Sequence, residues 1–166
     1  MKTIASILIL VLFSFCLLYG QSEGDYRSFQ SGNWHSSETW EVVIGGEWVL
    51  SSSIPAAATA NNVTVRSGHT VTVNNHITID QLVVEADAQV IASFDKNIIV
   101  SDGAGDDMVV YGSLTTSGTT NQGSIGLSGN GKVIIHGDYY WQSGGITNTD
   151  LWVAPSGILH LDGSVR

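Results

Sequence analysis

The chain has 166 residues, and six Lys or Arg stand against fifteen Asp or Glu, so the formal net charge is −9 at neutral pH. Affinity for nucleic acid comes largely from Lys and Arg at the phosphates, so this charge argues against a nucleic-acid partner. It argues equally against an anionic lipid surface and suits an exported protein with neutral or cation-bridged partners.

The first twenty residues have the pattern of a secretory signal peptide. Lys2 precedes a nearly continuous apolar stretch over residues 4–19, and Gly20 supplies a small residue before Gln21. The apolar stretch is shorter than the ~20 residues that a membrane-spanning helix needs, and no basic stop-transfer cluster follows it. We expect residues 1–20 to be removed. The mature chain would then be extracellular or at the cell surface, without a membrane span.

The single cysteine, Cys16, lies inside this apolar stretch. A lipoprotein cysteine is the alternative, but the bulky Phe15 stands where such sites need a small residue. We therefore predict a mature chain without disulfides, whose stability comes from burial and hydrogen-bond ladders.

Residues 21–61 differ from the rest of the mature chain because they hold three of the five tryptophans, Trp34, Trp40 and Trp48. Residues 39–44 and 47–50 predict a β-hairpin with Gly45-Gly46 as its two-residue turn. Such a Trp-rich segment suits an N-terminal cap over the open end of a repetitive β-structure. An aromatic platform for a sugar ring is the alternative.

From residue 62 the chain repeats one pattern of short strand, small-residue corner and second short strand. Apolar residues alternate with polar ones, often Thr, as expected for strands with one buried face. The repeats begin a little above 20 residues apart, a spacing typical of stacked solenoids. They cover residues 63–73, 82–93, 108–118, 133–144 and 151–163.

These features predict an all-β protein. We expect a right-handed parallel β-helix over residues 62–166, because single small residues at the corners let the chain bend and continue into parallel pairing. A β-sandwich is the alternative. The last repeat still has mid-solenoid character, so we expect the coils to continue beyond this chain or to associate end to end with another chain.

Residues 29–92 resemble the start of the eight-glycine domain of large extracellular proteins and the N-terminal regions of secreted bacterial parallel β-helix (pectin-lyase-like) surface proteins. The matching residues are Gly32-Asn33-Trp34, Thr39-Trp40, Pro55, Val63-Thr64-Val65, Ser67-Gly68-His69 and Val71–Val73. The resemblance implies a right-handed β-helix at a cell surface, often within a long adhesin or a carbohydrate-active protein. It implies no catalytic residues.

The metal candidate is the loop over residues 101–107, which holds Asp102, Asp106 and Asp107 among glycines. Clustered carboxylates suit Ca²⁺, which takes six to eight oxygen ligands. The spacing does not match an EF-hand, and an ordinary solvated turn is the alternative. We expect no other cofactor.

The later aromatic cluster is the candidate for carbohydrate binding, because aromatic rings stack on sugar rings. It consists of Tyr139, Tyr140, Trp141 and Trp152. Filling of the interior or of a junction between coils is the alternative for these rings.

We therefore expect a non-catalytic exported module for adhesion to an extracellular polysaccharide or a surface protein. The alternative is a polysaccharide lyase or glycoside hydrolase of the β-helix type, or a part of one. Its carboxylates would come from Asp80, Glu85, Asp87 and Asp138, and its cation from Arg66 or Lys132.

Overall fold

The computed structural model describes residues 21–116, 125–142, 145–147 and 150–161. The expected signal peptide over residues 1–20 lies outside these ranges. The fold is all-β, as predicted, and the only helical element in the described ranges is one 3₁₀ turn, η1 (Ser37–Thr39).

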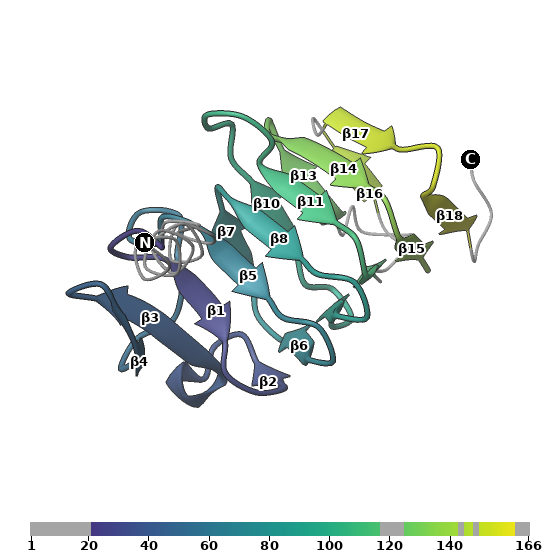
Figure 1. The fold of residues 1–166 in the computed structure, drawn as a ribbon. Helices are drawn as coiled ribbons and strands as arrows, with labels where there is room; N and C mark the ends of the chain where they lie inside the picture. Colours follow the sequence, from purple (N-terminus) through teal and green to yellow (C-terminus); the bar gives the residue numbers. More distant parts are fainter. Residues whose placement is uncertain (1–20, 117–124, 143–144, 148–149, 162–166) are drawn as a thin grey trace, which may run out of the picture.

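The described strands form three sheets, and from β5 onward each sheet takes every third strand (Figure 1). The first sheet contains, in spatial order, β17 (Asp150–Val153), β14 (Lys132–Ile135), β11 (Met108–Val110), β8 (Leu82–Val84), β5 (Val63–Val65), β1 (Tyr26–Ser28), β3 (Trp40–Ile44) and β4 (Glu47–Leu50). The second contains β18 (Ile158–Leu161), β15 (Asp138–Trp141), β12 (Ser113–Thr116), β9 (Gln89–Ala92), β6 (Thr70–Val73) and β2 (Gly32–Asn33). The third contains β16 (Gly145–Thr147), β13 (Ile125–Gly129), β10 (Ile98–Val100) and β7 (Ile77–Ile79).

Successive repeats pair in parallel and in register. Val63 lies opposite Leu82, and Leu82 lies opposite Met108 in turn. All three side chains are buried. The residue that follows each of them in its own strand is only partly buried and faces outward. A slip of one residue would turn a whole strand's buried set to solvent, so burial fixes the register. The parallel pairing expected between the repeats is confirmed.

The predicted hairpin is also confirmed, since β3 and β4 pair antiparallel with Ile44 opposite Glu47. Gly45 and Gly46 both have positive φ, at 64° and 84°, as a type I′ turn requires. β1 joins this hairpin to the repeats, because it pairs antiparallel with β3 and parallel with β5.

Two of the tryptophans in this N-terminal region belong to the core. Trp34 and Trp40 are fully buried and meet edge to face, with their ring centroids 4.9 Å apart. The indole of Trp34 donates to the carbonyl of Pro55, and that of Trp40 donates to the carbonyl of Trp34. These two rings therefore cannot form a sugar-binding platform.

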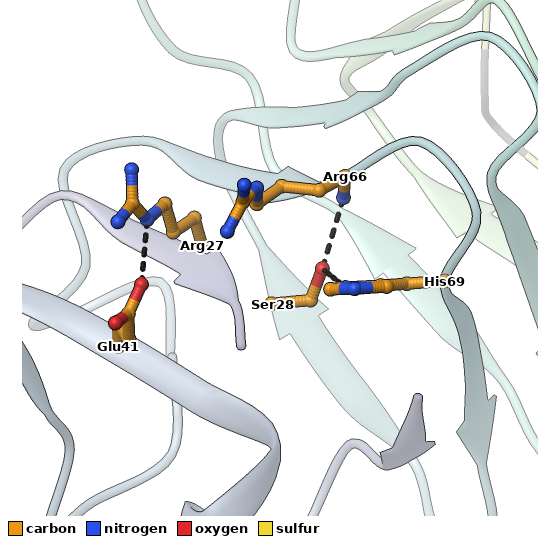
Figure 2. A network of polar contacts seen from close by, with 5 residues as sticks. All are labelled: Arg27, Ser28, Glu41, Arg66 and His69. Atoms are coloured by element: carbon orange, nitrogen blue, oxygen red, sulfur yellow. Dashed lines mark hydrogen bonds and ion pairs between the residues drawn. The ribbon is translucent and has the colours of Figure 1, made fainter. Parts of the chain in front are cut away.

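A polar network fastens β1 to the first corner of the repeats (Figure 2). The hydroxyl of the buried Ser28 accepts the backbone N–H of Arg66 at 2.9 Å and lies 2.8 Å from Nδ1 of His69. Beside it, Arg27 pairs with Glu41 at 2.7 Å and lies over the ring of Trp48. His69 thus takes part in the junction between β1 and the repeats.

Tyr139 should make the folded state sensitive to alkali. Burial raises the pKa of Tyr139 from 10.0 to about 12, and the smaller effect of the hydrogen bond with Thr116 lowers it. The pKa of Tyr139 is higher in the folded than in the unfolded chain, so its neutral phenol stabilises the folded state in full below pH 10. This contribution is lost as the pH rises toward 12, at about 1.4 kcal/mol per pH unit. Urea unfolding of the wild type and of Tyr139→Phe across this window should show the steeper loss in the wild type. Equal slopes would contradict the assignment.

Candidate binding recess at the strand corners

The corners between the first and second sheets differ in length along the stack. Four residues form the corner in three of the repeats, at positions 66–69, 85–88 and 154–157. Only two residues form it in the other two repeats, Tyr111-Gly112 and His136-Gly137. The strands on both sides keep their register, with Val84 opposite Val110 and Gln89 opposite Ser113. A two-residue corner must therefore lie closer to the core of the stack than the four-residue corner beside it.

The short corners approach the neighbouring backbone closely. The N–H of Ser113 donates to Ala88 O, and the N–H of Asp138 donates to Gly112 O, both at 2.9 Å. A Cβ atom on Gly112 would collide with the carbonyl oxygen of Ala88, and one on Gly137 with that of Gly112. Glycine is therefore the residue that lets the two short corners pack this deeply.

The set-back corners leave a recess of about 350 Å³, called here the corner recess. This volume is at the lower end of the roughly 300–1,000 Å³ that small-molecule sites occupy. The recess is lined by Asp87, Ala88, Gln89, Tyr111, Gly112, Ser113, Gly137, Asp138 and Tyr140.

Two tyrosines give the corner recess its aromatic surface. Tyr111 is 51% exposed and Tyr140 is 38% exposed. The ring of Tyr111 stacks on that of His136, with centroids 4.8 Å apart and an interplanar angle of 10°. This contact places the His136 ring against one face of the Tyr111 ring, while the residue as a whole stays about half exposed.

The polar lining is acidic. Asp87 and Asp138 contribute carboxylates and Gln89 contributes an amide, and no Lys or Arg belongs to the lining within the described part of the chain. Gln89, Ser113 and Asp138 are register partners at the start of three successive strands. The recess therefore combines aromatic faces with a row of polar groups that crosses several strands.

The four aromatic residues predicted to bind carbohydrate do not form one cluster. Tyr140 lines the corner recess, whereas Trp152 is 61% exposed elsewhere, on β17. Tyr139 is fully buried, with its hydroxyl 3.0 Å from Oγ1 of Thr116, and Trp141 packs partly buried against the core. For Tyr139 the prediction needs correction, because its register partner is the core residue Leu114 and its ring fills the interior.

Sequence reasoning missed Tyr111, which lies in a corner outside the aromatic cluster. The signal that could have found it is the difference in corner length between the aligned repeats, because the recess follows from that difference.

The aspartate loop is built differently from the predicted metal site. Asp107 is buried, and its carboxylate accepts the backbone N–H groups of Gly103 at 2.7 Å and Lys132 at 2.6 Å. Asp106 pairs with the Lys132 ammonium at 2.8 Å, and Asp102 is exposed. Within the described ranges, no three His, Cys, Asp or Glu side chains gather as they would around a metal ion. The structure gives Asp107 the role of a backbone acceptor.

Asp107→Asn should therefore destabilise the fold. An amide offers one acceptor oxygen in place of two, so one partly buried N–H group loses its bond to the buried Asp107 side chain, at a cost of about 1 kcal/mol or more. The matched control is Asp106→Asn, which removes only an exposed ion pair worth about 1 kcal/mol or less. Urea unfolding measures both, and equal small losses would contradict the role of Asp107.

Of the residues considered for an enzyme, the structure brings Asp87 and Asp138 together in the corner recess. The carboxylate of Glu85 accepts the N–H of Ser67, and a side-chain oxygen of Asp80 lies against Gly103. Neither cation candidate, Arg66 or Lys132, lines the recess.

Comparisons with protein-family models, with curated proteins and with solved structures gave no match. Over the ranges that the structure describes, no helix has the length and apolar character needed to cross a bilayer.

Proposed function

We propose that the chain is a parallel β-helix closed at its N-terminal end by the Trp-rich region. From β5 onward, the described strands pair in parallel in three sheets that each take every third strand, which supports this architecture. The sandwich alternative calls for strands joined as antiparallel hairpins. The described strands from β5 to β18 pair only in parallel.

We further propose that this β-helix is a non-catalytic exported module that binds carbohydrate, and that the corner recess is its binding site. One observation carries the proposal: two half-exposed tyrosines, Tyr111 and Tyr140, share a concave site with carboxylate and amide groups. Sugars present apolar C–H faces that pack on aromatic rings. Their hydroxyl groups donate to carboxylate and amide oxygens.

The cellular setting in this proposal comes from the sequence. The signal-peptide pattern of residues 1–20 supports export. The likeness of residues 29–92 to the start of secreted β-helix surface proteins supports a place at the cell surface. Adhesion to an extracellular polysaccharide is the activity that fits both.

Replacing the exposed tyrosines should weaken glycan binding. Tyr140→Ala and Tyr111→Ala each remove a stacking surface worth about 1–2 kcal/mol, so the affinity should fall roughly 5- to 30-fold. A glycan array identifies the ligand, and isothermal titration calorimetry then measures the variants against it. The matched control is Phe94→Ala, which removes an exposed ring outside the recess. Unchanged affinity in both tyrosine variants would contradict the proposed site.

A glycoside hydrolase is the second candidate, favoured by the presence of two carboxylates, Asp87 and Asp138, in one recess. Hydrolysis of a glycosidic bond uses a pair of carboxyl groups. A lyase fits less well, because the described residues that line the recess include no Lys or Arg to stabilise developing negative charge. Incubation with the bound polysaccharide separates the candidates. New reducing ends that are formed by the wild type but not by Asp138→Asn would show that the protein is an enzyme. Binding without products would support the non-catalytic binding module.

A further inference from the structure

We propose that the corner recess binds an oligosaccharide that carries ammonium groups, an amino-sugar polymer rather than a neutral or uronic-acid one. This inference rests on the proposed carbohydrate-binding function and adds the chemical class of the ligand. Its basis is the distribution of charge in and around the recess.

Among the residues that the structure describes, the charged groups lining the recess are all acidic. Its charged lining residues, Asp87 and Asp138, are both carboxylates at neutral pH. The whole chain is acidic as well, with a net charge of −9, so the long-range field also attracts cations. A polymer of uronic acids would bring further carboxylates against these groups, and the repulsion would oppose its binding.

Neither Arg66 nor Lys132 lines the recess. Arg66 lies on the first of the four-residue corners, and Figure 2 shows its side chain extending toward Arg27 on β1. β1 lies on one side of β5 in the sheet, and β8 and β11, which lead into corners of the recess, lie on the other, so Arg66 extends away from the recess. Lys132 begins β14, at the opposite end of that strand from the His136 corner, and pairs with Asp106.

The two carboxylates are spread along the stack. Asp87 precedes β9 and Asp138 begins β15, and β12 lies between these two strands. Neighbouring strands lie about 4.8 Å apart, so the two positions are roughly 10 Å apart along the stack. A ligand that meets both must extend beyond one sugar ring, and Tyr111 and Tyr140 line the same recess. An oligosaccharide with recurring ammonium groups has this shape and charge.

The test uses four probes with calorimetry at about pH 6.5, where Asp is ionised. The probes are the tetramers of glucosamine, N-acetylglucosamine, glucose and galacturonic acid. We expect the glucosamine tetramer to bind at least about threefold more tightly than the acetylated and neutral tetramers. This difference in affinity should become smaller as the ionic strength rises from about 0.02 M to about 0.5 M, because salt screens the charges. Asp87→Asn and Asp138→Asn should each reduce the preference. Asp87→Asn should leave the backbone undisturbed, because Asn tolerates the positive φ of 62° at position 87. The control is Asp102→Asn, which lies outside the recess.

The outcomes separate this inference from the function on which it rests. Equal binding of the charged and neutral tetramers, or tighter binding of galacturonate, would overturn the amino-sugar assignment and leave carbohydrate binding standing. A preference for glucosamine that survives both Asp→Asn changes would also overturn it, because the ammonium contact would then lie elsewhere on the acidic surface. Failure to bind any tetramer, with no arrayed glycan sensitive to Tyr140→Ala, would overturn the proposed function itself.

Discussion

The register between successive parallel strands is the constraint on which the rest of this structure depends. Buried residues such as Val65, Val84 and Val110 lie directly opposite one another, so each strand can shift only by exposing its apolar face. The corners are held at both ends by such strands. Losing two residues from a corner therefore leaves the register unchanged and draws the corner inward. The corner recess is the direct result of this constraint at Tyr111-Gly112 and His136-Gly137.

The sequence was sufficient to predict the strand repeats because their period-two alternation is strong, as in Val63-Thr64-Val65. It did not settle which face of β15 is buried. Tyr139, Tyr140 and Trp141 are all aromatic, so no alternation is visible, and only the pairing of Tyr139 with Leu114 decides the face. The role of Asp107 was equally hidden. Its partners are backbone N–H groups, one of them at Lys132, 25 residues away, and backbone groups leave no mark on a sequence.

The same architecture separates stability from recognition. The buried apolar residues of successive strands and the contact of Ser28 with His69 hold the stack together. The groups proposed to contact a ligand lie on the corners and on the outer faces of the strands. The corners can vary in length and in charge without disturbing the core, as the two-residue and four-residue corners of this chain illustrate. An acidic recess lined by tyrosines is one product of that freedom. Its chemistry, more than the fold, directs the proposal to an amino-sugar oligosaccharide.

The most direct test of this account is to lengthen one short corner. Replacing Tyr111-Gly112 with a four-residue corner that keeps the tyrosine and otherwise copies residues 85–88 should leave the melting temperature close to that of the wild type, because neighbouring repeats already carry such corners. Calorimetry on the same protein should show that glycan binding is lost, because the added residues fill the recess. Wild-type affinity in a folded, lengthened protein would contradict the claim that the set-back corners form the binding site.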